Sequence, residues 1–245
     1  MAPRKQLTLE RILHSQGFGT RRECRALVRH KQVWVENLLC DDPEQLFDPN
    51  GLSFSVAGTP WMYQERAYLM LNKPAGYECS QKPRHHPSVY TLLPEPLVLR
   101  GVQSVGRLDE DTTGLLLFSD DGQFIHRMAS PKWKVNKVYR VGVRHPLTTV
   151  QIEALLQGVV LHDEPEPVAA VACEQIDAHT LDLTLAEGKY HQVKRMLAAV
   201  GNRVETLTRS AIGALALPPD LAPGAWRWLD ADACVSVQRV SQMPE

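Results

Sequence analysis

Short apolar segments bounded by turn residues recur from residue 67 to the C-terminus, and this pattern limits the fold more than any other feature of the chain. These segments predict strands at residues 68–71, 115–118, 138–143, 168–173, 181–185 and 203–207. Helical spacing of apolar residues predicts helices at 122–128, 149–157 and 191–200. Because the helices are interspersed among the strands without strict alternation, we expect an α+β fold with a mixed, largely antiparallel central sheet and flanking helices.

The composition is that of a folded chain. Hydrophobic residues make up 44% of the 245 residues and charged residues 22%, which is ordinary globular usage. No apolar segment approaches the roughly 20 residues that cross a bilayer, and the first residues lack the hydrophobic stretch of a secretion signal. The five cysteines are scattered, with no Cys-x-x-Cys pair. We therefore expect a cytoplasmic protein with reduced thiols.

Positive charge is concentrated at the N-terminus. Residues 1–40 contain eight lysines and arginines against three glutamates, a net charge of +5, so the remainder carries −6 within a total of −1. Thr20 and Glu23 form a capping box that predicts the start of a helix. This helix displays Arg22, Arg25 and Arg29 away from its apolar face. The arginines are either a solvated helix face or a surface that binds phosphates, and the local excess of charge favours the second interpretation.

An acidic, turn-rich stretch separates this segment from the rest of the chain. It spans about residues 41–66 around one candidate strand, Leu52–Val56. We expect a small domain at residues 1–60, a linker at 61–66 and a larger domain at 67–245.

The densest polar cluster is the run from Gly106 to Gly114, which leads directly into the predicted strand at 115–118. Loops mounted on rigid strands often carry catalytic groups, although an acidic turn that bonds its own backbone is the more common structure. Asp109 and Asp111 lie two residues apart, but the rest of a calcium-binding loop is absent.

Two further clusters could contribute chemistry. Residues 187–196 begin at a glycine turn and enter a helix, where Lys194 lies at the margin of the apolar seam. In the segment 137–141, strand alternation places Lys137 and Tyr139 on one face. A lysine at such a margin is usually a surface charge, and a tyrosine on a sheet usually packs in the core or at an interface. The sequence has no phosphate-binding loop, dinucleotide fingerprint, zinc motif or serine-hydrolase elbow.

Together these segments resemble the pseudouridine synthases, in the branch that acts on ribosomal RNA. The matching segments are Leu69–Tyr77, Gly106–Gly122, Lys137–Tyr139 and Gly188–Met196, in the order of the family. The segments Leu9–Leu13, Thr20–Cys24 and Lys31–Val35 resemble an S4 RNA-binding module, although Glu36-Asn37 stands where that module usually has Asn-Gly. The resemblance implies the pseudouridine synthase fold preceded by a small α/β S4-like domain.

The resemblance also implies roles for individual residues. Asp109 is the expected catalytic aspartate, Tyr139 packs against the target uracil, and Lys194 pairs with the aspartate. The expected RNA-binding residues are Arg21, Arg22, Arg25, Arg29, Lys31, Lys73, Arg107, His191 and Gln192. An aspartate needed as a nucleophile or base must stay ionised, and an adjacent ammonium favours that form. The resemblance implies that a uridine of ribosomal RNA is isomerised to pseudouridine. This isomerisation consumes no redox equivalent or group donor, so no cofactor and no metal are expected.

The length of the catalytic domain and the S4-like module favour the small-subunit type, the RsuA family, with 16S ribosomal RNA or a ribosome assembly intermediate as partner and the protein as a monomer. Two alternatives remain open. One is a synthase acting on large-subunit ribosomal RNA. The other is a non-catalytic S4-containing factor that binds RNA or assists ribosome assembly.

Overall fold

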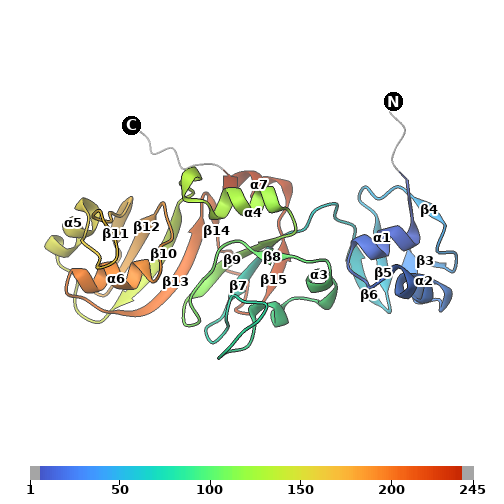
Figure 1. Ribbon diagram of the computed structural model, residues 1–245, viewed down its shortest axis with the longest axis horizontal. Helices are drawn as coiled ribbons and strands as arrows, with labels where there is room; N and C mark the ends of the chain where they lie inside the picture. The colour runs from blue at the N-terminus through green and yellow to red at the C-terminus, as the bar shows by residue number, and fades with distance from the viewer. Residues whose placement is uncertain (1–5, 239–245) are drawn as a thin grey trace. The chain divides into compact units, whose positions relative to one another are not determined.

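The computed structural model describes residues 6–238, which form two compact units (Figure 1). Of the described residues, one unit comprises 6–67 together with 93–103, and the other comprises 68–92 together with 104–238. Within residues 6–238, no helix is long and apolar enough to cross a membrane.

The first unit packs two helices against a small sheet. Its elements are β1 (Leu7–Thr8), α1 (Leu9–Ser15), α2 (Arg21–Arg29), β2 (Val33–Val35), β3 (Leu38–Cys40), β4 (Leu46–Phe47), β5 (Ser53–Val56), β6 (Thr59–Met62) and α3 (Glu95–Leu99). The four-stranded sheet has the order β3-β2-β5-β6, and β1 pairs with β4. The predicted capping box is present, because the Thr20 hydroxyl accepts from the Glu23 amide and the Glu23 carboxylate accepts from the Thr20 amide.

Residues that were expected in a linker belong partly to this small sheet. Trp61 lies in β6, is buried, and donates its ring N–H to Gln16 at 3.4 Å. The Gln16 side chain also accepts from Arg100 at 2.9 Å and from the Gln64 amide at 3.0 Å. Hydrogen bonds to the buried side-chain amide of Gln16 therefore hold the segment 61–66 against the first unit. The turn-rich composition of the segment did not indicate this contact.

The second unit is built on a nine-stranded sheet. Its main path is β11 (Ala172–Gln175), β12 (Thr180–Leu185), β10 (Lys137–Val143), β13 (Val204–Ile212), β9 (Thr113–Ser119), β7 (Tyr68–Lys73) and β15 (Trp226–Trp228), while β14 (Leu215–Ala216) pairs with β13 and β8 (Gln103–Ser104) pairs with β9. The helical segments are η1 (Val89–Leu92), α4 (Gly122–Ala129), η2 (Pro131–Trp133), α5 (Thr149–Gln157), α6 (Gln192–Ala199) and α7 (Ala231–Gln238). Along the main path and between β13 and β14 the neighbours pair antiparallel, except β13 and β9, which run parallel. The mixed, largely antiparallel sheet of the prediction is thus confirmed.

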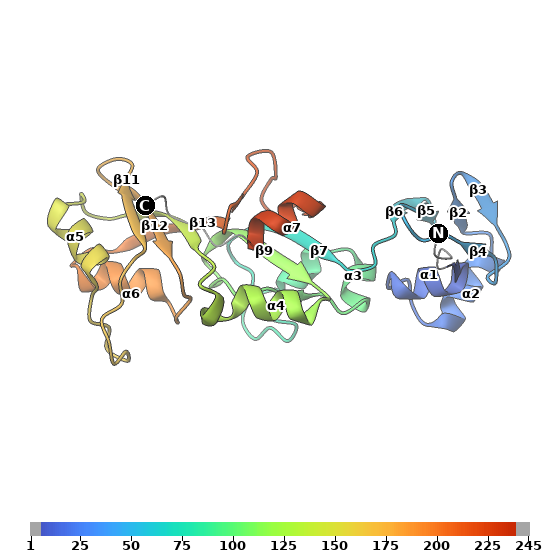
Figure 2. The ribbon, with the colours of Figure 1, turned by 90° about the horizontal axis from the view of Figure 1, so that it is seen from above.

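Two hydrophobic clusters lie on either side of the parallel pair. One contains Leu155 of α5 and Met196 of α6 with the strands around β10 and β12. The other contains Phe124 of α4 and Val237 of α7 with β7 and β9. Figure 2 shows the two groups of elements in separate parts of the unit. The parallel pairing between them is short and joins Thr208 with Thr113 and Arg209 with Gly114.

The predicted strand at 168–173 differs most from the structure. Val168 forms only an isolated bridge with Val159, and the Ala170 amide donates to the Leu155 carbonyl at the end of α5. The regular strand β11 begins at Ala172. An apolar run looks the same in sequence whether it pairs with a strand or packs beside a helix, so this boundary was not predictable.

The buried ammonium of Lys73 fixes the loop before β9. Lys73 ends β7, is fully buried, and donates to four backbone carbonyls at 2.9–3.1 Å, those of Pro74, Asp109, Glu110 and Thr112. Burial lowers the pKa of Lys73, and the nearby carboxylates offset part of that effect. The acidic loop 109–112 is thereby folded around a positive charge.

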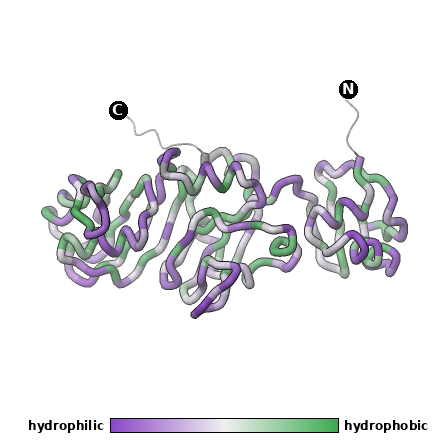
Figure 3. The backbone as a smooth tube through the Cα atoms, in the orientation of Figure 1, coloured by the Kyte–Doolittle hydropathy of each residue, from purple (hydrophilic) through white to green (hydrophobic). Residues whose placement is uncertain are grey.

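The family resemblance implied that Lys73 contacts RNA, but in the structure its ammonium is fully buried and bound by four carbonyls of the protein. Both faces of β7 carry buried residues. An exposed basic segment does occur farther along, in the hydrophilic loop 81–86 after β7 (Figure 3). There the Glu78 carboxylate accepts from the amides of Arg84, His85 and His86 at 2.8–3.1 Å.

Replacing Lys73 by Met should lower the free energy of unfolding by about 3 kcal/mol, because four buried carbonyls lose their shared donor. Urea denaturation of the purified protein at neutral pH measures this loss. Lys82→Met removes an exposed lysine of the same unit and is the matched control, with an expected change within about 0.5 kcal/mol. Equal losses in the two variants would show that the ammonium does not hold the loop.

Candidate active site

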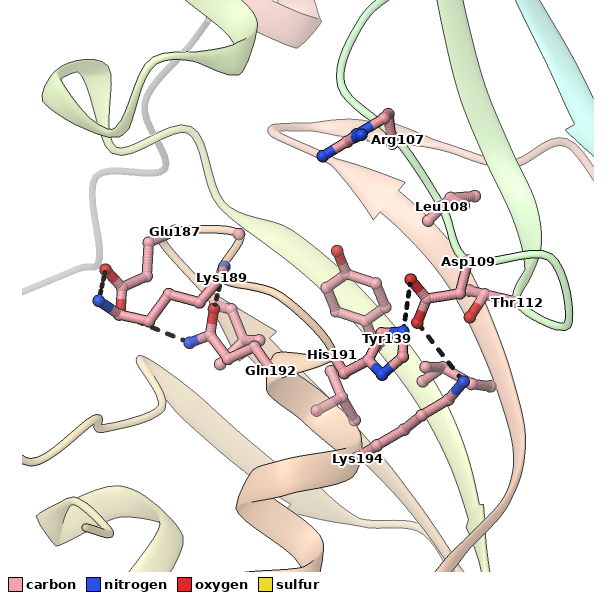
Figure 4. A pocket seen from close by; sticks show the side chains of 14 residues that line it. Arg107, Leu108, Asp109, Thr112, Tyr139, Glu187, Lys189, His191, Gln192 and Lys194 are labelled. Atoms are coloured by element: carbon pink, nitrogen blue, oxygen red, sulfur yellow. Dashed lines mark hydrogen bonds and ion pairs between the residues drawn. The ribbon is translucent and has the colours of Figure 1, made fainter. Parts of the chain in front are cut away.

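Three segments that are distant in the sequence form one cavity of about 80 Å³ in the second unit. The loop before β9 contributes Asp109, strand β10 contributes Tyr139, and helix α6 contributes Lys194 (Figure 4). The other lining residues are Arg107, Leu108, Thr112, Leu185, Glu187, Gly188, Lys189, His191, Gln192, Val193 and Leu207. Apolar side chains and the Tyr139 ring thus face a group of charged side chains across a small space.

The carboxylate of Asp109 lies between the Lys194 ammonium and the His191 ring. Its Oδ2 is 3.4 Å from Lys194 Nζ and its Oδ1 is 3.5 Å from His191 Nε2 (Figure 4). The side chain is 31% exposed, so a ligand in the cavity can reach the carboxylate. This arrangement presents a carboxylate, already supplied with a counter-charge, at the edge of a cavity that has an aromatic wall.

Lys194 has a second and closer partner that the sequence did not single out. Its ammonium donates to both oxygens of Asp111 at 2.7 and 2.8 Å. Burial alone would lower the pKa of Lys194, but the hydrogen bond to Asp111 and the charges of Asp109 and Asp111 outweigh it and raise that pKa. Burial likewise opposes ionisation of Asp111, and the Lys194 hydrogen bond and charge prevail and lower its pKa. The lysine therefore stays protonated between two carboxylates.

The start of α6 is held by hydrogen bonds and ion pairs among side chains of the cavity lining and Glu164. Gln192 is 4% exposed, and its carbonyl accepts from the Lys189 amide at 2.9 Å. Lys189 Nζ in turn lies 2.6 Å from Glu164 and 3.6 Å from Glu187. Gln192 was predicted to bind RNA, but its amide is used within the protein. It positions the turn that precedes Lys194.

His191 takes a left-handed backbone conformation just before α6, with φ 47°. Its ring stacks on that of Tyr190, with ring centres 3.8 Å apart and an angle of 18° between the planes. Tyr190 is largely exposed. The strained backbone thus aims the His191 ring at Asp109, and His191 remains a candidate for ligand contact.

The arginines of the first unit line a separate groove along α2. The groove is formed by Glu10, Arg21, Arg22, Arg25, Ala26, Arg29 and His30. Arg21, Arg22 and Arg29 are exposed, as is Lys31. Arg25 differs from them, because its guanidinium binds the buried Glu10 carboxylate and lies 3.1 Å from Glu44. Arg25 therefore holds α1 and α2 together in addition to any contact it makes outside.

Among the described residues 6–238, no group of three or more histidine, cysteine, aspartate or glutamate side chains is arranged to hold a metal ion. The cavity lining contains two carboxylates, three cationic side chains and an aromatic ring, namely Asp109, Glu187, Arg107, Lys189, Lys194 and Tyr139. These groups can stabilise and move charge on an organic ligand and can pack against a flat ring.

Comparisons with known proteins agree on one family. The family model described as RNA pseudouridylate synthase matches residues 67–199. The chain is 45% identical over 170 residues to the ribosomal small subunit pseudouridine synthase A of Yersinia pestis, with 69% of this chain and 72% of that protein covered. The same enzyme of Escherichia coli K12 is also 45% identical over 170 residues, with 69% and 73% covered.

Two relatives cover more of the chain. The uncharacterized RNA pseudouridine synthase YtzG of Bacillus subtilis is 37% identical over 227 residues, which span 91% of this chain and 95% of that one. A solved structure titled "Crystal structure of pseudouridylate synthase" has a TM-score of 0.68 and 33% identity and covers 94% of this chain and 99% of its own. The predicted resemblance is thus confirmed, and the chain belongs to the RNA pseudouridine synthase family.

Proposed function

We propose that this protein converts a specific uridine of 16S ribosomal RNA into pseudouridine, with Asp109 as the catalytic carboxylate. Two relatives named as small-subunit enzymes, each 45% identical, support the choice of RNA. The observation that carries the proposal is the Asp109 carboxylate, which lies at the cavity edge 3.4 Å from an ammonium and opposite an aromatic wall.

The reaction needs only rearranged bonds. The N-glycosidic bond between uracil and ribose breaks, the base turns, and a new bond forms between the same ribose carbon and C5 of the ring. The proton of C5 leaves, and the nitrogen that left the ribose gains one, so no oxidant, reductant or group donor is consumed. An ionised carboxylate acting as nucleophile or base is a sufficient catalyst for this change. The cavity residues are sufficient for it as well.

Each neighbour of Asp109 has a role in this proposal. Lys194 offsets the cost of placing the carboxylate in a site from which the substrate excludes water. Tyr139 stacks on the uracil after the base has left its helix, which recovers part of the few kcal/mol that extrusion costs. Arg107 and His191 line the cavity and contact the nucleotide. Because Lys194 also binds Asp111, its position is fixed before RNA arrives.

The exposed basic residues of the first unit supply binding that is independent of base identity. We assign phosphate contacts to Arg21, Arg22, Arg29 and Lys31, which are exposed along or next to α2. The protein acts as a monomer in the cytoplasm on ribosomal RNA or an assembly intermediate.

Asp109→Asn should abolish turnover while leaving the fold and RNA affinity nearly unchanged, because it removes one charge without changing size. We expect kcat to fall by at least about 10²-fold. Single-turnover pseudouridine formation on 16S ribosomal RNA and a separate binding assay provide the two readouts. Glu110→Gln makes the same charge change on the same loop, away from the cavity lining, and should keep full activity. Near wild-type turnover by Asp109→Asn would refute its catalytic role.

The identity of the target RNA has its own experiment. Pseudouridines are mapped in 16S and 23S ribosomal RNA from cells with and without the gene and from cells carrying only Asp109→Asn. We expect one 16S pseudouridine to disappear in both mutant strains. Loss of a 23S pseudouridine would assign the enzyme to the large subunit, and no loss in either RNA would favour a non-catalytic role in RNA binding or assembly.

Replacing Arg21, Arg22 and Arg29 together by Gln should weaken RNA binding and reduce the slope of log affinity against log salt by about three units, roughly one for each phosphate contact. The variant is compared with wild type at several salt concentrations. Arg25→Gln is the contrasting variant, because it leaves the buried Glu10 unpaired and should lower stability more than the salt slope. An unchanged slope in the triple variant would mean that the arginines form only a solvated helix face.

A further inference from the structure

A second cavity, of about 100 Å³, adjoins the active-site cavity in the same unit. Arg107, Tyr139 and Gly188 line both cavities, so the two share a wall. The charged side chains around the second cavity are Arg107, Lys137 and Arg209, and no aspartate or glutamate is among its lining residues. The rest of the lining is largely apolar, from Val105, Met128, Ala129 and Ile212.

The sheet brings these cations together on one face. Tyr139 on β10 lies directly opposite Arg209 on β13, next to a register shift between Val138 and Tyr139. Lys137 precedes Tyr139 by two residues, and alternation places both on the same face. Arg140 points to the other face, where it forms two hydrogen bonds with Asp182 at 2.7 and 2.9 Å. The strand thus carries one cation with a carboxylate partner and one without.

Arg209 has an unused donor inside the protein. Arg209 is only 4% exposed, and its Nε donates to the Leu115 carbonyl at 2.7 Å. The Nη2 atom is buried and has no hydrogen-bond partner among residues 6–238. A buried guanidinium nitrogen without an acceptor is costly, so an acceptor in the cavity would stabilise it.

Lys137 shares this environment. Burial and the charge of Arg209 lower the pKa of Lys137 to about 8. Two cations therefore lie close together in largely apolar surroundings with no counter-ion from the described side chains around the cavity. Binding an anion would remove this repulsion, and a guanidinium with a free nitrogen suits an oxyanion with several acceptor oxygens.

We propose that this second cavity binds a backbone phosphodiester of the substrate RNA, adjacent to the nucleotide whose base enters the first cavity. The inference rests on the proposed function for the identity of the RNA. Lys137 and Arg209 supply the charge, and Arg107 stands at the boundary with the first cavity. Because Tyr139 lines both cavities, an anion in the second cavity lies next to a base that stacks on Tyr139 in the first. This arrangement suits a phosphate that flanks the same nucleotide.

The test uses synthetic RNA that spans the mapped target uridine, in which each flanking phosphodiester is replaced in turn by an uncharged methylphosphonate. With the wild-type protein, one linkage beside the target should weaken binding by about tenfold or more when neutralised. Lys137→Met should weaken binding of unmodified RNA by a similar factor. Neutralising the same linkage should then cause no further loss in this variant, because the contact between Lys137 and the phosphate is already absent. Arg140→Met removes one charge from the opposite face of β10 and should keep the wild-type sensitivity.

The pH dependence provides a second readout. The groups that face Lys137 around the cavity are Tyr139 on its own strand, Arg209 from β13 and Arg107 from the loop before β9. As the pH rises from 7 to 8.5, Lys137 passes through its pKa of about 8 and loses its charge, so wild-type affinity should fall. Lys137→Met should lack this fall, and an equal fall in both proteins would count against the site.

Two outcomes overturn the proposal, and neither depends on whether the protein is catalytic. The first is that no neutralised linkage beside the target weakens binding by the wild-type protein more than binding by Lys137→Met, although the wild-type protein binds the unmodified RNA. The second is that inorganic phosphate shifts the NMR signals of the Lys137 side chain while no linkage shows such a difference between the two proteins, which would make the cavity a site for a free anion. If one linkage affects binding only when Lys137 is present, but no pseudouridine forms, the result would support the phosphate site and refute the proposed function.

Discussion

The ammonium of Lys73 is the interaction on which the active site depends. It lies at the end of a strand covered on both faces, and it turns the backbone carbonyls of Asp109, Glu110 and Thr112 inward toward one positive charge. A loop that folds its carbonyls inward projects its side chains outward, so the carboxylates of Asp109 and Asp111 reach Lys194. The fully buried cation thereby organises a partly exposed cation and its two acidic partners.

The cations of the second unit differ in what balances their charge. Lys194 is balanced by two carboxylates, and Lys189 by Glu164 and Glu187. Arg209 has only a carbonyl acceptor, and its neighbour Lys137 has a lowered pKa. Cations with partners fix the protein's own geometry, whereas those without them gain stability from an incoming anion. A protein that binds a polyanion and also holds a carboxylate in a precise position needs cations with carboxylate partners and cations without them.

The sequence predicted which segments meet but not how deeply their side chains are buried. The loop 106–114, the strand at Tyr139 and the helix at Lys194 converge as the family resemblance implied. Burial of Lys73 and Gln192 was missed, because a polar residue beside an apolar run resembles an exposed one until both covering layers are known. The two-residue spacing of Asp109 and Asp111 could not indicate which lies nearer to Lys194. Arg209 was missed because the strand was predicted to end at residue 207, whereas β13 continues to Ile212.

The short parallel pairing of β13 with β9 joins two halves that have separate hydrophobic clusters. Asp109 belongs to the half containing β9, whereas Tyr139 and Lys194 belong to the half containing β10 and α6. At the junction, Gly114 has φ +100°, and a side-chain carbon there would lie 2.3 Å from the Arg209 carbonyl. Asp109 and Lys194 thus come from different halves of the sheet, and the short parallel pairing that joins these halves sets the distance between them. The spacing of the candidate site therefore depends on the same backbone contacts that join the two halves.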